Sequence, residues 1–67
     1  MCRSIKTLRS LDPPATSDDV AAAARQFVRK ISGYREPSQV NTAAFEQAVT
    51  DISEISQRLL DSLVVRG

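Results

Sequence analysis

The sequence predicts an all-α fold, an antiparallel two-helix hairpin with an N-terminal arm packed over the longer helix. Apolar residues recur with the 3.6-residue period of a helix in two segments, at about 17–32 and 42–64. Prolines and glycines, which interrupt regular structure, fall before, between and after these segments. The 67 residues leave room for one small domain, made of an arm (1–14) and a helical hairpin (15–67).

The first predicted helix, at about 17–32, has both a start signal and a stop signal. Pro13 and Pro14 end the preceding segment, because proline has no backbone N–H and restricts the residue before it. Thr16 stands where an N-cap belongs, and Asp19 follows three residues later as a short version of the capping box. Gly33 favours the left-handed backbone that stops a helix. The predicted apolar stripe of this helix is Val20, Ala24, Phe27 and Ile31.

The second predicted helix follows a connection at 33–41, in which Pro37 prevents helical continuation. Either Ser38 or Asn41 can cap the next helix, which we expect to begin near Thr42 and to run to about 64. Its apolar stripe keeps the helical period for several turns. The stripe consists of Phe45, Ala48, Val49, Ile52, Ile55, Leu59 and Leu63, widened late by Leu60 and Val64.

The second helix is expected to extend beyond the first, which leaves an apolar end in need of a cover. Exposing several leucines to water costs several kcal/mol at about 25 cal/mol per Å². One possible cover is the N-terminal arm, where a short helical or 3₁₀ turn over about 3–11 would place apolar residues every third position. The other is a second copy of the chain, giving a homodimer. The arm residues with this spacing are Ile5, Leu8 and Leu11.

Charge is divided unevenly along the chain, although the net charge is only +1. Residues 1–35 carry seven basic and three acidic side chains, whereas residues 36–67 carry two basic and five acidic ones. We favour pairing of the two halves within one molecule over head-to-tail association of two molecules. Within the second helix, Glu54 and Arg58 have the spacing and order of a favourable ion pair.

Composition excludes most chemistry and sets the expected compartment. The single cysteine suggests a reducing cytoplasm, and we expect neither a secretion signal nor a membrane span. Without histidine, no serine has the usual base and the common zinc ligand sets cannot form in one chain. No phosphate-binding glycine pattern is present. We therefore expect a protein that is not an enzyme and has no metal, cofactor or small-molecule substrate.

The leading functional hypothesis is a non-enzymatic protein-interaction module. A small chain with little core and an arm of mixed basic and apolar residues fits a protein that depends on a partner. The docking surface is expected at the N-terminal arm and the apolar end of the second helix. Its candidate residues are Ile5, Leu8, Leu11, Leu60, Leu63 and Val64.

An alternative hypothesis is a nucleic-acid-associated protein, in which a basic stripe contacts phosphates. Arg25, Arg29 and Lys30 form this stripe on the first helix. The same residues also suit a solvated helix face whose last turn compensates the helix dipole, and the near-neutral net charge favours that interpretation. The candidate contacts to phosphate or to an acidic partner are Arg3, Lys6, Arg9, Arg25, Arg29 and Lys30.

Three other features are candidate sites. Cys2 is a weak candidate for a reactive thiol or a metal-linked role, and burial as a small apolar anchor is the favoured alternative. Asp51 and Glu54 lie one helical turn apart, yet a lone pair of carboxylates is more often solvated surface than an acid–base pair. Tyr34 is expected to pack at the closed end of the hairpin, against Phe45 or Val40.

Several segments together resemble a family of short bacterial proteins classed as a domain of unknown function. The resemblance covers nearly the whole chain, and its opening Met-Cys-Arg-x-Ile-Lys is distinctive. It implies a bacterial, cytosolic, helical protein and brings no activity, substrate or catalytic residue. The segments that carry it are Met1-Cys2-Arg3-Ser4-Ile5-Lys6, Pro13-Pro14-Ala15-Thr16, Gln26-Phe27-Val28-Arg29-Lys30-Ile31-Ser32-Gly33, Pro37-Ser38 and Ala44-Phe45-Glu46-Gln47-Ala48-Val49.

Overall fold

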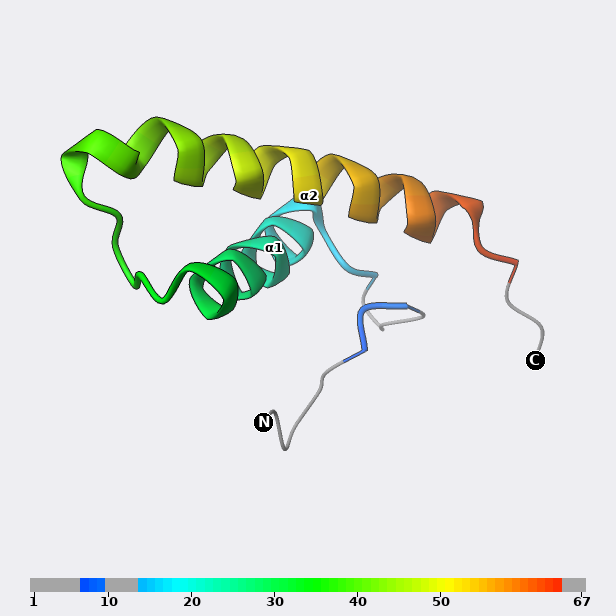
Figure 1. The fold of residues 1–67 in the computed structure, drawn as a ribbon. Helices are drawn as coiled ribbons and strands as arrows, with labels where there is room; N and C mark the ends of the chain where they lie inside the picture. The colour runs from blue at the N-terminus through cyan, green and yellow to red at the C-terminus, as the bar shows by residue number, and fades with distance from the viewer. Residues whose placement is uncertain (1–6, 10–13, 65–67) are drawn as a thin grey trace.

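The computed structural model describes residues 7–9 and 14–64 of the chain. Two helices, α1 (Ser17–Ser32) and α2 (Thr42–Ser62), are joined by a loop that ends in one turn of 3₁₀ helix, η1 (Gln39–Asn41). The helices pack on each other, and the described residues contain no strand (Figure 1). The predicted all-α hairpin is therefore confirmed.

Helix α1 has the bounds that its capping signals predict. The hydroxyl of Thr16 accepts a hydrogen bond from the backbone N–H of Asp19 at 3.2 Å, and a carboxylate oxygen of Asp19 accepts one from the N–H of Thr16 at 2.8 Å. This reciprocal capping box satisfies two donors that the first turn otherwise leaves without partners. At the other end Gly33 has a φ of 78°, and its N–H donates to the carbonyl of Arg29 at 2.9 Å.

Helix α2 begins at Thr42 as predicted but ends at Ser62, two residues before the predicted end at 64. Leu63 already has an extended backbone, with a ψ of 138°. The hydroxyl of Ser62 donates to the carbonyl of Arg58 at 2.7 Å, so a side chain within the last turn bonds one of the carbonyl groups at the helix end. No proline or glycine stops the helix here. Because the last turn lies beyond α1, packing does not extend the helix further.

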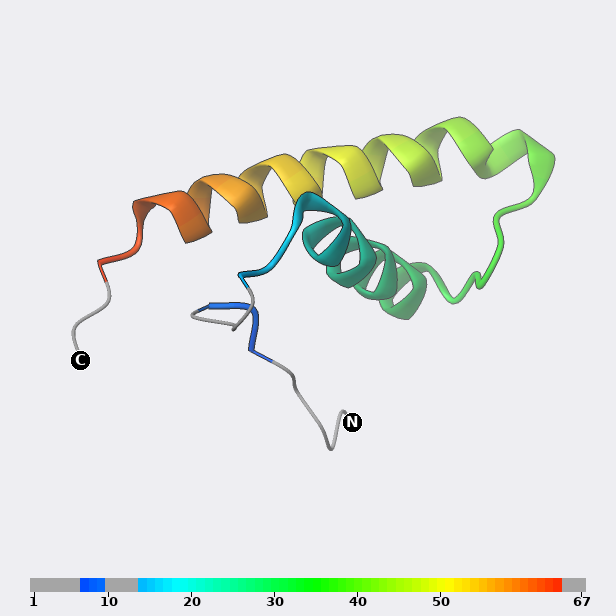
Figure 2. The ribbon, with the colours of Figure 1, turned by 180° about the vertical axis from the view of Figure 1, so that it is seen from behind.

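The core lies between the two helices and is small. On each helix the buried residues form a row in which neighbours are four positions apart: Val20, Ala24 and Val28 on α1, and Phe45 and Val49 on α2. Ala48 and Ile52 pack against this cluster. When rows spaced by four interdigitate, helices cross at roughly 50° instead of the roughly 20° of a coiled coil. Figures 1 and 2 show α1 crossing α2, with the two ribbons diverging toward the loop.

The predicted apolar stripe of α1 was wrong in its second half. Val28 is buried, with 3% of its surface exposed, whereas Phe27 is 50% and Ile31 is 64% exposed. Residues spaced by 4, 3 and 4 positions lie along one face of a straight helix. Where two helices cross at a large angle, residues spaced by four positions are the ones that stay in contact. Phe27 and Ile31 consequently lie beside the contact and not within it.

Only Thr7–Arg9 of the predicted arm segment 3–11 is described. These residues form no helix, with a turn at Arg9, and Leu8 is half-buried. Cys2, Arg3, Ile5, Lys6 and Leu11 lie outside the described residues, so packing of the whole arm over α2 stays a prediction. At the far end of α2, Leu60 is half-buried, whereas Leu63 and Val64 are exposed.

Candidate interaction site

The contact between α1 and α2 has two edges of opposite chemistry. Residues three and four apart on a helix share a face, so each edge is a row of side chains. We call the first the charged edge; it consists of Arg25, Arg29, Glu36 and Glu46. We call the second the apolar edge; it consists of Ala23, Phe27, Ile31, Ala44, Ala48, Ile52, Ile55 and Leu59.

An ion pair between the helices closes the charged edge. The Nη1 and Nη2 atoms of Arg25 donate to the two carboxylate oxygens of Glu46 at 2.9 and 2.7 Å, the bidentate geometry that suits a guanidinium. The central carbon (Cζ) of the Arg25 guanidinium lies 5.7 Å from the centroid of the Phe45 ring, within cation–π range. Arg25 therefore joins α1 to α2 through both a carboxylate and an aromatic face.

A second arginine ties the connecting loop to α1. The Nε atom of Arg29 donates to the carbonyl oxygen of Arg35 at 3.0 Å, and its Nη2 lies 3.8 Å from Oε1 of Glu36. Both arginines belong to the basic half of the chain, and both glutamates belong to its acidic half. The favoured prediction, pairing of the two halves within one molecule, is confirmed at these two contacts. By contrast, the predicted pair of Glu54 and Arg58, both described residues, does not form within 4 Å.

Ionisation at the charged edge follows from this geometry. The hydrogen bond to Glu46 raises the pKa of Arg25 above its ordinary value, because it stabilises the charged guanidinium. The hydrogen bonds from Arg25 lower the pKa of the Glu46 carboxyl for the same reason. Both shifts favour the charged forms, so the pair stays ionised at neutral pH.

The apolar edge is hollowed into two adjoining depressions that are open to solvent. The one nearer the loop has a volume of about 290 Å³, and its lining includes Ile31, Tyr34, Ala44, Phe45 and Ala48. The other has a volume of about 310 Å³ and is lined by Ala23, Ala24, Phe27, Ile52 and Ser56. Because Ala48 and Ile52 are one turn apart on α2, and Phe27 and Ile31 one turn apart on α1, the depressions follow one another along the same edge.

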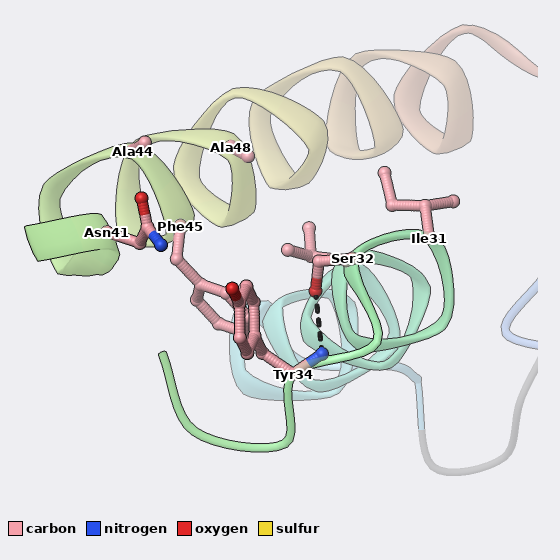
Figure 3. Close-up of a pocket in the computed structure, with 8 residues that line it drawn as sticks. Ile31, Ser32, Tyr34, Asn41, Ala44, Phe45 and Ala48 are labelled. Atoms are coloured by element: carbon pink, nitrogen blue, oxygen red, sulfur yellow. Dashed lines mark hydrogen bonds between the residues drawn. The ribbon is translucent and has the colours of Figure 1, made fainter. Parts of the chain in front are cut away.

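Figure 3 shows how the depression nearer the loop is built. Ile31 projects from α1 at one end, and the rings of Tyr34 and Phe45 stand at the other. The N–H of Tyr34 donates to the hydroxyl of Ser32 at 3.2 Å, which fixes the start of the loop. Tyr34 was expected to pack against Phe45 or Val40. It lines the same depression as Phe45, whereas Val40 is 87% exposed.

The apolar edge continues along α2 beyond the depressions. Ile55 and Leu59 are both more than half exposed, and Leu63 follows them one turn later. Among the described residues, more large apolar side chains are exposed than buried. An exposed apolar face of this extent, next to an open groove, is typical of a protein–protein contact surface.

The candidate residues fall into two groups in the structure. Leu60 lies in the last turn of α2, whereas Leu63 and Val64 were expected in the helix but follow its end at Ser62. Phe27, Ile31 and Ile55 are exposed residues of the predicted apolar stripes, and Leu59 is exposed in the part of α2 that was expected to extend beyond α1. A helical period shows that a face is apolar, but it does not distinguish the part that packs internally from the part beside it.

The basic candidates are dispersed. Arg25 and Arg29 are engaged with glutamates, while Lys30 and Arg9 are exposed. The described residues therefore give the nucleic-acid hypothesis no gathered basic patch, and it stays a prediction. Within 7–9 and 14–64, no group of three histidine, cysteine, aspartate or glutamate side chains is arranged to hold a metal ion. Neither α1 nor α2 is long and apolar enough to cross a bilayer.

Fold and site together define a small two-helix protein with one ion-paired edge and one apolar edge. The chain matches a family described as uncharacterised conserved protein, DUF2277, over residues 1–67, and it belongs to that family. The predicted resemblance to a family of unknown function is thereby confirmed. Comparisons with curated proteins and with solved structures give no match.

Proposed function

We propose that this protein is a non-enzymatic interaction module whose apolar edge binds an amphipathic helix of a protein partner. The observation that carries the proposal is the apolar edge itself, an open groove between α1 and α2 that continues along α2. Grooves between helices commonly receive the apolar face of a further helix. The opposite edge is closed by the pair of Arg25 and Glu46, which supports the apolar edge as the docking side.

The spacing of the apolar residues on α2 supports a helical partner. Ala48, Ile52, Ile55 and Leu59 are separated by 4, 3 and 4 residues, which is the a/d spacing of a coiled-coil seam. Such a seam presents a narrow stripe that pairs with an equivalent stripe on another helix. Side chains of the buried core, spaced by four, face α1 instead. Ala48 and Ile52 also border the core, whereas Ile55 and Leu59 are exposed, so only the second half of the stripe is free of contact with α1 in the described structure.

The proposed surface keeps part of the predicted one and moves its centre. The apolar end of α2, with Leu60, Leu63 and Val64, extends the edge beyond α1. The centre lies at Ile55 and Leu59, between this end and the groove. The contribution of the arm stays a prediction, because only residues 7–9 of its apolar segment are described.

Site-specific photo-crosslinking in the cells that make the protein tests this proposal. A benzoylphenylalanine is placed at Ile55 on the apolar edge or, as a matched control, at Thr50, an exposed position on the other side of α2. We expect a covalent product with a protein, either another one or the chain itself, from position 55 and little from position 50. Equal products from the two positions, or none from position 55, would contradict the proposal.

A further inference from the structure

We propose that the helix bound by the apolar edge is α2 of a second copy of this chain, antiparallel to the first about a two-fold axis. This inference rests on the proposed function and names its partner. It follows from three features of α2: the pairing of large and small residues along the stripe, the charges beside it, and the part of α2 that extends beyond α1.

The apolar stripe of α2 is complementary to itself when reversed. An antiparallel register that sets Ile52 against Ile55 of the second copy also sets Ala48 against its Leu59. Two-fold symmetry repeats both layers, so four layers form from one stripe. Two of the layers join two isoleucines, and two join Ala48 to Leu59. No layer sets two small side chains against each other, so each contains at least one four-carbon side chain to fill it.

Charges beside the stripe fit the same register. Asp51 and Arg58 are about two turns apart on α2 and lie on the side of the stripe that faces away from α1. Antiparallel pairing brings Asp51 of each copy close to Arg58 of the other, so opposite charges meet twice. Both side chains are exposed, and the carboxylate of Asp51 accepts a hydrogen bond from the side-chain amide of Gln47 at 2.9 Å. Neither residue forms an ion pair within the described part of the chain.

The unequal lengths of the two helices agree with this arrangement. Helix α2 has 21 residues and α1 has 16, so within residues 7–9 and 14–64 the C-terminal part of α2 has no helix beside it. In the antiparallel pair this part lies opposite the N-terminal half of α2 of the second copy. That half carries α1, whose Phe27 and Ile31 widen the apolar edge. Each copy thereby covers the apolar end of the other, and a net charge of only +1 gives little repulsion between copies.

Light scattering of the full chain after size exclusion provides the first test. One helix pair with four layers is a small interface, so association is expected at roughly 10–100 μM. We expect the mass to rise from 7.3 kDa toward twice that value as concentration increases. Ile55→Glu places a carboxylate in two of the four layers and is expected to keep the protein monomeric throughout. Since Ile55 is 57% exposed, the helix content by circular dichroism should not change.

A charge exchange tests the orientation. Asp51→Arg and Arg58→Asp each set like charges against one another, and each is expected to weaken association about tenfold. Mixing these two variants, or combining them in one chain, restores opposite charges at both contacts and is expected to restore association. Glu54→Arg is the control, because it makes the same charge change as Asp51→Arg on the outer face of α2. The inference is wrong if mixing does not restore association, or if the control weakens it equally.

The two proposals fail differently. A chain that stays monomeric to roughly 1 mM, well above the expected range, overturns the second-copy inference. If position 55 then crosslinks to a different protein, the proposed function stands with another partner. If position 55 gives no protein product, both proposals are wrong.

Discussion

The charged and apolar edges of the helix contact differ in how far each is completed within one molecule. On the charged edge, Arg25 and Arg29 both find carboxylates of the same chain. On the apolar edge, Phe27, Ile31, Ile55 and Leu59 are half exposed or more. The two arginines are thus paired within the molecule, whereas part of the apolar surface stays exposed to solvent. In a small domain, which buries only about 60% of the surface of its unfolded chain, such leftover surface is where association is expected.

The largest expected effect comes from Phe45, the core residue that borders both edges. Phe45→Ala removes the ring that lies under Arg25 and lines the groove, and it should cost about 3–5 kcal/mol of folding free energy. A chain of this size has about that much stability in total, so we expect largely unfolded protein by circular dichroism. Val40→Ala is the control, because Val40 is 87% exposed and its loss should change stability by less than about 0.5 kcal/mol. A folded Phe45→Ala variant of normal stability would show that the two edges are independent.

A smaller effect is expected on the apolar edge. In dilute solution, Ile55→Gln should change the free energy of unfolding by about 0.5 kcal/mol or less, because more than half of the Ile55 side chain is already exposed. At high concentration the wild-type chain should gain stability by association, and the variant should not. Urea unfolding at two protein concentrations, with Thr50→Gln as the matched exposed control, measures both quantities. A large loss in dilute solution would place Ile55 in the core of the single molecule.

The smallest effect is expected on the charged edge, where it takes the form of a pH dependence. Folding lowers the pKa of Glu46 below its ordinary 4.5, so the contribution of this carboxylate is complete above that value and is lost as the pH falls through the lowered pKa. Glu46→Gln should therefore reduce stability slightly at pH 7 and flatten its decline in acid. Urea midpoints of both proteins at several pH values from 7 to about 3 test this expectation. Parallel curves would mean that the ion pair contributes nothing.

The boundaries that local chemistry determines could be predicted from the sequence. Thr16, Asp19 and Gly33 specify the ends of α1 through hydrogen bonds and a backbone preference that act over a few residues. Helix α2 begins at Thr42, as expected after Pro37, but neither Ser38 nor Asn41 makes the expected capping hydrogen bond with its side chain. The end of α2 lacks such a signal, because packing decides it, and the prediction was two residues too long.

Predicting the site was harder for a physical reason. The apolar character of α2 was evident from its period, but the helix carries two adjoining apolar stripes. In one, residues four apart are buried against α1; in the other, the spacing alternates between four and three residues. Only the angle at which α1 crosses decides which of them is buried. For that reason Phe27, expected in the stripe, is half exposed, and Val28 is buried. The bidentate contact between Arg25 and Glu46 joins residues on separate helices, and no sequence pattern specified it beyond opposite charge in the two halves.

The position of Phe45 limits how the two edges can vary. One face of its ring is near a guanidinium, and the ring also lines the groove near the loop. A substitution that reorients Arg25 would therefore change the shape of the groove, and a partner that shifts the ring would change the environment of the ion pair. Acid that protonates Glu46 should accordingly weaken the proposed docking along with folding, and an affinity measured near neutral pH would then not hold in acid.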